Sequence, residues 1–267
     1  MAVSANTLFH FTSIKGLTGI LASGGFYCQY SPEHFENILP SKSHYRFTYL
    51  PMTSFCDLTI MQLSNDSLHR KSFGDFGIGL TKAWGVRNGV SPVMYVHKES
   101  QQTKRLNRLI KAIKQFRKNT VDEETLDELA EETLDAIEQI DNIEQEMIDS
   151  FKYIKPYTGY WQKGKRKRKK IIFYDEREWR YSPLMKEYAV LSGVFKDNKK
   201  EVKEINEKLK KKIIKFEVND VKFIVIKKKK DLSAISDVIQ NMTISEEQKD
   251  QLKTKVISFE EIKEDFG

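Results

Sequence analysis

Residues 104 to 150 restrict the fold more than any other part of the sequence, because this run contains neither glycine nor proline. Apolar residues recur along it at the spacing of amphipathic helices, in two sets: Leu106, Leu109, Ile110, Ile113 and Phe116, then Leu126, Leu129, Ile137, Ile140 and Met147. The first segment, 104 to 118, carries seven Lys or Arg and no acid, whereas the second, 122 to 149, carries acids and no base. We therefore expect an antiparallel helical hairpin of opposite charge. Such an insertion suits a scaffold or a partner-docking surface better than a catalytic element.

The rest of the sequence predicts an α+β fold. Residues 7 to 98 hold short apolar runs broken by turn formers, which favours small strands and a few short helices. Thr12 or Ser13 can cap a helix through Leu21 that Gly24-Gly25 would end. Further elements are expected at 93–96 (strand), 171–181 (half-buried strand), 196–212 (Lys-rich helix), 213–218 with 223–226 (strand pair), 233–240 and 246–253 (short helices). We expect one domain, residues 1 to 267, with a split, mixed β core, peripheral helices and the hairpin inserted at 104 to 150.

Composition excludes several classes of protein. Cys28 and Cys56 are the only cysteines, without metal-ligand or disulfide spacing, so we expect neither a zinc site nor a bridge. No stretch approaches the roughly 20 apolar residues that cross a bilayer, and no signal peptide opens the chain, so we expect a soluble, cytoplasmic protein. The net charge of +7 permits a polyanionic partner, and most of the excess lies in short blocks after residue 100.

Three segments could carry chemistry. The first is Leu8-Phe9-His10-Phe11-Thr12, where His10 could equally be a hydrogen-bonded core histidine. The second is Met52-Thr53-Ser54-Phe55-Cys56-Asp57, followed by a glycine-containing stretch at 73–84 that lacks the spacing of a phosphate-binding loop. The third is Glu176-Arg177-Glu178-Trp179-Arg180.

The third segment favours glycosidic chemistry. On a strand, Glu176, Glu178 and Arg180 would share one face, and two carboxylates that point the same way would raise each other's pKa. A fixed carboxylate near a ribose can stabilise the positive charge that develops when a glycosidic bond breaks. The alternative is an exposed strand face with a ladder of Glu and Arg.

Taken in order, these motifs resemble the AbiGi group of bacterial abortive-infection proteins. The resemblance rests on residues 8–12, Ile20-Leu21, Gly24-Gly25-Phe26, Ser54-Phe55-Cys56-Asp57, Phe76-Gly77-Ile78-Gly79-Leu80, Pro92-Val93-Met94-Tyr95-Val96 and 176–180. It spans nearly the whole chain apart from the helical insertion. That group in turn resembles a distant branch of the ADP-ribosyltransferase fold, alongside the DarT-like toxins whose chains also open with a His-x-Thr strand.

This resemblance implies an NAD site. It makes His10 the ligand of the adenosine ribose, with Thr12 and its neighbour Phe11 on the nicotinamide side. Glu178 becomes the catalytic acidic residue, and Glu176 would orient the acceptor nucleophile. Ser54 would brace Glu178. Because the middle motif departs from the usual pattern, the aromatic ring that stacks on nicotinamide stays open between Tyr27, Tyr30 and Phe55.

A basic run precedes the third segment and suggests the acceptor. Residues 163 to 170 hold one glycine and seven Lys or Arg, among them Lys165, Arg166, Lys167 and Arg168. Tyr157, Tyr160 and Trp161 lie just before it, so stacking groups adjoin phosphate-binding ones. RNA or single-stranded DNA is the first expectation, although a charged run is often solvated surface and a protein side chain is another possible acceptor.

The expected protein is thus an NAD-dependent ADP-ribosyltransferase toxin without a metal, restrained by a neutralising antitoxin. The rival from another class is a non-catalytic antitoxin or regulatory partner that docks through the hairpin. A nuclease is disfavoured, because no Arg lies four to six residues before any of the five histidines and no Asp…Glu-x-Lys carboxylate cluster is evident.

Overall fold

The computed structural model describes residues 5–65, 73–120, 131–161, 169–183 and 199–266. Lys165, Arg166, Lys167 and Arg168 of the basic run lie outside these residues.

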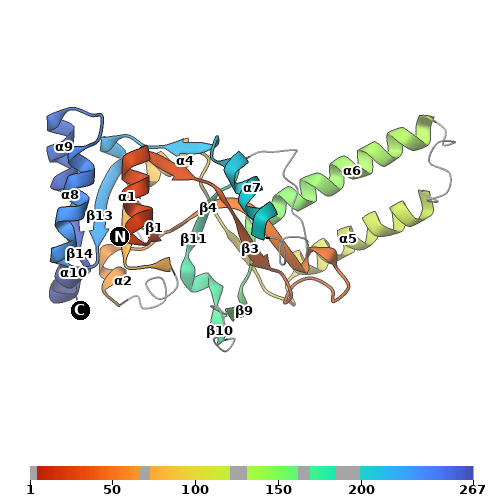
Figure 1. Cartoon of the computed structure of the whole chain (residues 1–267). Coiled ribbons are helices and arrows are strands. Elements are labelled where there is room, and N and C mark those ends of the chain that lie inside the picture. Colours follow the sequence, from red (N-terminus) through yellow and green to blue (C-terminus); the bar gives the residue numbers. More distant parts are fainter. Residues whose placement is uncertain (1–4, 66–72, 121–130, 162–168, 184–198, 267) are drawn as a thin grey trace.

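One large sheet forms the centre of the protein, with the strand order β14-β13-β5-β1-β4-β11-β6 and β3 beside β4 (Figure 1). Its strands are β1 (Thr7–Thr12), β3 (Gln29–His34), β4 (Phe47–Cys56), β5 (Phe76–Thr81), β6 (Ser91–Pro92), β11 (Glu178–Tyr181), β13 (Val221–Ile226) and β14 (Val256–Ser258). Neighbours pair antiparallel, except β13 and β14, which are parallel. The predicted α+β class with a mixed sheet is confirmed.

Three strand pairs lie outside this sheet. They are β2 (Gly25–Tyr27) with β12 (Ile213–Lys215), β7 (Met94–Val96) with β8 (Ile154–Pro156), and β9 (Thr158–Trp161) with β10 (Lys169–Ile172). The predicted pairing of 213–218 with 223–226 is wrong. A short 3-10 turn, Val218–Asp220, separates the two segments, and Asp220 closes it by accepting a bond from the backbone of Glu217. Each strand therefore pairs elsewhere, β12 with β2 and β13 with β5 and β14.

Helix α1 (Ile14–Ser23) begins where the sequence predicts. Ser13 caps it by accepting from the backbone N–H of Gly16, and Gly24 ends it in the left-handed conformation, at φ 62°. Within the described ranges, the other helices outside the hairpin are α2 (Ile60–Asn65), α4 (Lys82–Arg87), α7 (Lys199–Leu209), α8 (Leu232–Gln240), α9 (Glu246–Lys253) and α10 (Phe259–Phe266). The predicted short helices near 233–240 and 246–253 are confirmed as α8 and α9.

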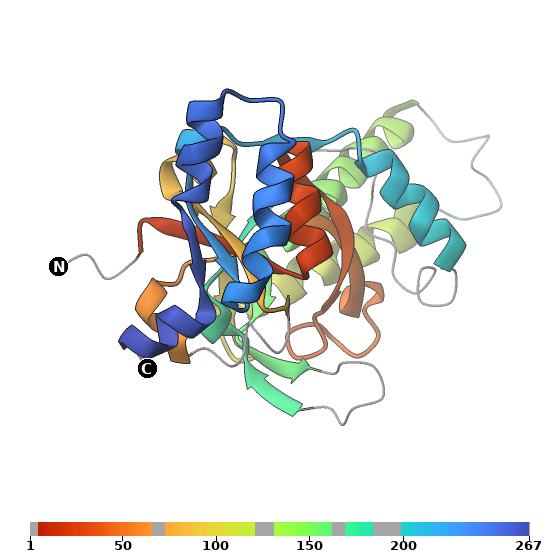
Figure 2. The same cartoon turned by 60° about the vertical axis from the view of Figure 1, so that its left-hand side comes forward.

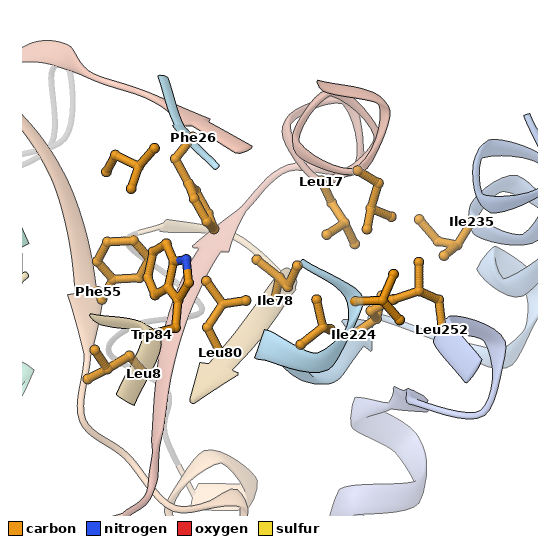
Figure 3. Packing of buried hydrophobic residues seen from close by; sticks show 14 of the residues in the cluster. Leu8, Leu17, Phe26, Phe55, Ile78, Leu80, Trp84, Ile224, Ile235 and Leu252 are labelled. Atoms are coloured by element: carbon orange, nitrogen blue, oxygen red, sulfur yellow. The ribbon is translucent and has the colours of Figure 1, made fainter. Parts of the chain in front are cut away.

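The main core lies between the sheet and the pair α1 and α8, which lie side by side in Figure 2. Leu17 of α1 and Ile235 of α8 pack with Ile78 and Ile224 of the sheet (Figure 3). Trp84 joins the same cluster, and its ring nitrogen donates to the carbonyl of Lys215 at 2.9 Å. This packing fixes α1 against the sheet beside β1.

The predicted hairpin is present as α5 (Gln101–Thr120) and α6 (Glu131–Phe151), which project from the sheet in Figure 1. Arg117 of α5 pairs with Asp141 at 2.6 Å and with Glu144 at 2.5 Å, both on α6. Ile110 and Ile113 of α5 belong to a second buried cluster that also holds Phe35 and Phe151. The hairpin is therefore anchored to the body through its base.

No helix among the described residues combines the length and the apolar character that crossing a membrane requires.

Candidate active site

A cleft of about 730 Å³ opens between α1 and the strands β1, β3 and β4. It is lined by nine of the residues that the sequence singles out: His10, Phe11, Thr12, Tyr27, Ser54, Phe55, Tyr160, Glu176 and Glu178. Lys15, Gly16 and Gly19 of α1 also line it. Trp161 ends β9, and its side chain is outside the described residues.

Strand pairing brings the three sequence motifs together. Cys56 of β4 is opposite Phe9 of β1 on one side and opposite Glu178 of β11 on the other. The ring of His10 contacts the carbonyl oxygen of Ser54, with Nδ1 at 2.8 Å. The Ser54 hydroxyl in turn donates to Oε1 of Glu178 at 2.6 Å. His10, Ser54 and Glu178 therefore form one connected chain across three strands.

The protonation of His10 follows from this contact. A carbonyl oxygen can only accept, so Nδ1 carries the proton and Nε2 is the accepting nitrogen. Burial lowers the pKa of His10 below its ordinary value, although the bond to Ser54 opposes this shift. The ring is thus neutral at pH 7 and suited to accept a hydrogen bond from a hydroxyl of a ligand.

Glu178 is a buried carboxylate with four donors. Ser54 and the Nε of Arg180, at 2.7 Å, donate to Oε1. The Nζ of Lys155, at 2.8 Å, and the Nη2 of Arg180, at 3.0 Å, donate to Oε2. A carboxylate offers about four acceptor sites, so all of them are used. Burial alone would raise the pKa of Glu178, but Arg180 and Lys155 outweigh it and hold the pKa well below its ordinary value.

Glu176 lies next to Glu178, but its pKa is shifted in the opposite direction. Its Oε2 accepts from Lys155 Nζ at 2.6 Å. Burial raises the pKa of Glu176, and the Lys155 charge offsets only part of that rise. The expectation that the two acids raise each other's pKa is wrong for Glu178, because Arg180 binds Glu178 directly. One cleft thus holds a fixed anion and a carboxylate more easily protonated.

The backbone before Glu178 differs from the predicted continuous strand over 171–181. A 3-10 turn, Phe173–Glu176, follows β10, and Arg177 then adopts the left-handed conformation with φ 44° before β11 begins. The Arg177 carbonyl accepts from the backbone N–H of Asp57, which fixes the turn against β4. Phe173 and Glu176, three residues apart, both line the cleft as a result.

The alternative of an exposed Glu and Arg ladder is also wrong. Arg180 is fully buried, and its Nη2 binds Glu33 of β3 at 2.6 Å while its Nη1 donates to the carbonyl of Lys152 at 3.1 Å. Lys155 carries its charge under the same conditions: burial opposes protonation, but Glu178, Glu176 and Glu33 raise its pKa. The network therefore holds two cations and three acids inside the protein.

Lys155, Glu33 and Tyr95 are site residues to which the sequence assigned no role, although Tyr95 lies in one of the motifs that carry the resemblance. Lys155 lies in the short run Tyr153-Ile154-Lys155-Pro156-Tyr157, where a lone charge among apolar residues was the available signal. The hydroxyl of Tyr95 accepts from the backbone N–H of Glu178 at 2.8 Å. No pattern around Glu33 or Tyr95 indicates these contacts.

The three candidate nicotinamide rings occupy different environments. Tyr27 is exposed in the cleft, whereas Phe55 is buried and packs against Phe26 and His10. Tyr30 is buried on β3 and does not line the cleft. Tyr27 is therefore the ring of the three that a planar ligand group can cover.

Metal binding has no support within the described ranges, where no group of three or more His, Cys, Asp or Glu side chains could hold an ion.

Comparison with known proteins gives one family. The family model described as "Putative abortive phage resistance protein AbiGi, antitoxin" matches residues 26–227. The chain is also similar to the "Abortive phage resistance protein AbiGi" of Lactococcus lactis subsp. cremoris, with 27% identity over 262 residues, which is 90% of this chain and 99% of that protein. No solved structure matches.

Proposed function

The chain belongs to the AbiGi family of abortive phage resistance proteins, and from this premise we propose that it is an NAD-dependent ADP-ribosyltransferase toxin. The observation that carries this proposal is the Glu178 carboxylate, which accepts from Ser54, Arg180 and Lys155 and lines a cleft of about 730 Å³ together with His10 and Tyr27. A carboxylate that stays charged can stabilise positive charge as a glycosidic bond breaks.

The residues of the cleft fit a dinucleotide. The volume of the cleft lies within the roughly 300–1,000 Å³ range of small-molecule sites. The accepting Nε2 of His10 suits a ribose hydroxyl, the exposed ring of Tyr27 suits a nicotinamide, and the ammonium of Lys15 suits a pyrophosphate. When bound, NAD supplies an activated bond between its ribose and nicotinamide.

Glu178 and Glu176 have separate roles in this proposal. Glu178, with its lowered pKa, remains an anion and stabilises the charge on the ribose. Glu176, with its raised pKa, is suited to take the proton from the attacking group of an acceptor. Because all four acceptor sites of Glu178 are in use, a ribose hydroxyl must replace one donor. The Ser54 hydroxyl is the one that can do so without moving a charge, since it rotates freely.

The proposal is tested by incubating the protein with labelled NAD and total RNA. Transfer of label to nucleic acid is the expected result. Shortened RNA without label would indicate a nuclease, and NAD that stays unchanged both with RNA and with cell protein would contradict the enzyme. A parallel incubation with cell protein detects a protein acceptor.

We expect the basic run to capture the acceptor without taking part in chemistry. Replacing Lys165, Arg166, Lys167 and Arg168 with Gln should leave slow NAD hydrolysis intact and weaken modification of RNA or single-stranded DNA. The slope of log affinity against log salt should shrink by up to about 3, because fewer counterions are released. Binding and transfer are measured over a salt series. Normal modification at every salt concentration would mean that this run is only solvated surface.

A second candidate is a non-catalytic antitoxin that retains the cleft. The complete occupation of the Glu178 oxygens favours it, because a carboxylate with four protein donors is stable without a substrate. The family description also uses the word antitoxin. In this case the charged hairpin α5–α6 binds a toxin.

Expression in cells separates the two candidates. A toxin should arrest growth when expressed alone and be neutralised by a partner encoded nearby, whereas an antitoxin should be harmless alone and relieve arrest by that partner. Harmless expression of the wild-type chain would count against the toxin.

A further inference from the structure

Two exposed tyrosines form a small aromatic surface beside the cleft. Tyr157 is 39% exposed and Tyr174 is 52% exposed, and their ring centroids are 6.0 Å apart. The ring of Tyr174 also packs edge-on against Tyr95, with centroids 5.3 Å apart. Tyr174 thus contacts both Tyr157 and Tyr95. The exposed faces of two neighbouring rings can be covered by a planar ligand group.

The surface is joined to the acidic residues of the cleft through short stretches of backbone. Tyr157 lies two residues after Lys155, and Tyr174 lies two residues before Glu176. Within the 3-10 turn Phe173–Glu176, Phe173 and Glu176 line the cleft, while Tyr174 is exposed and contacts Tyr157 and Tyr95. Tyr95 also binds the backbone N–H of Glu178. A ligand on these rings therefore lies close to the residues that would act on an acceptor.

Charge identifies the kind of ligand. Lys170 of β10 is exposed and lies opposite Tyr160 of β9, four residues before Tyr174. Tyr160 is itself exposed and lines the cleft. Aromatic rings beside cations are the usual means of binding single-stranded nucleic acid, because bases stack on the rings and phosphates meet the cations.

We propose that Tyr157 and Tyr174 form a base-stacking platform for single-stranded nucleic acid, the acceptor class of the transferase. This inference rests on the proposed function for its biological role, but the platform itself is tested by binding alone. RNA and DNA share the stacking chemistry, so either can occupy it, and a preference would come from contacts with the 2′-hydroxyl.

The test is fluorescence anisotropy of labelled 12-nucleotide RNA and DNA strands, measured without NAD. Tyr157→Leu and Tyr174→Leu remove stacking but keep apolar area, whereas Tyr157→Phe and Tyr174→Phe keep the rings. Each Leu variant should raise Kd by roughly 5- to 150-fold, the range for losing one stacked base, and each Phe variant should bind like wild type. Phe47→Leu is the matched control, because Phe47 is 37% exposed and contacts His34 rather than the platform. Thermal unfolding checks that every variant folds.

The platform would be overturned by wild type that binds neither strand, or by Leu variants that bind both strands as tightly as wild type does. Loss of binding in the Phe variants as well would assign the contacts to the hydroxyl groups and also contradict stacking. Failure of the proposed function looks different. If strands bind in the predicted pattern but no label moves from NAD, the platform stands and the transferase does not.

Discussion

Glu178→Gln is expected to lower turnover of NAD by roughly two to three orders of magnitude while NAD still binds. Gln has nearly the same shape and can still accept from Ser54, but it lacks the charge that would stabilise the ribose. The cations are not left alone, because Lys155 retains Glu176 and Arg180 retains Glu33. Turnover is measured by nicotinamide release and binding by calorimetry.

Asp220→Asn is the matched control for this variant. Asp220 is also a buried, ion-paired carboxylate, bound by Arg87 at 2.9 Å, but it does not line the cleft. Its variant should keep wild-type turnover. Full activity of Glu178→Gln would remove Glu178 from the mechanism, and equal losses in both variants would assign the effect to stability.

Arg180→Leu should have the largest effect on stability. It leaves Glu178 and Glu33 buried with less compensation, and breaking a buried pair in this way costs about 3–5 kcal/mol. For a chain of this size that lowers the melting temperature by roughly 6–20 °C. Lys210→Leu is the control, because Lys210 and Glu207 are 58% and 52% exposed and losing their ion pair should cost about 1 kcal/mol or less.

The loss of unfolding free energy caused by Arg180→Leu should also depend on pH. In the wild type the lowered pKa of Glu178 contributes stability that is present above about pH 4.3, its unfolded value, and is lost as the pH falls below it. Without Arg180 the pKa is less depressed, so there is less of this stability to lose. Urea unfolding is measured from pH 7 down to pH 3. The difference in free energy of unfolding between wild type and Arg180→Leu should become smaller as the pH falls. A difference that stays constant or widens would contradict the assigned charge states.

Local patterns predicted the elements that local interactions determine. The hairpin follows from apolar spacing and separated charge within α5 and α6, and the pair of Arg117 with Asp141 agrees with it. The end of α1 follows from Gly24, which readily adopts positive φ. The 3-10 turn was missed because Arg177, which has no such preference, adopts the left-handed conformation there.

The site was predicted in part, for a related reason. The ordered motifs indicated His10, Ser54 and Glu178, and the pairing of β1, β4 and β11 joins them. Lys155 was missed because it meets Glu176 across 21 residues of sequence, and no periodic pattern carries that contact. Without Lys155 and the binding role of Arg180, the direction of the Glu178 pKa shift could not be predicted.

A structure with a non-hydrolysable NAD analogue tests the central claim most directly. We expect the analogue to occupy the cleft, with a hydroxyl of the adenosine ribose on Nε2 of His10 and the nicotinamide against Tyr27. The nicotinamide ribose should lie within hydrogen-bond distance of Glu178, in place of the Ser54 hydroxyl. Two results would contradict the assignment of this cleft as an NAD site. The analogue could be bound elsewhere, or it could be absent at saturating concentration while Glu178 keeps all four protein donors.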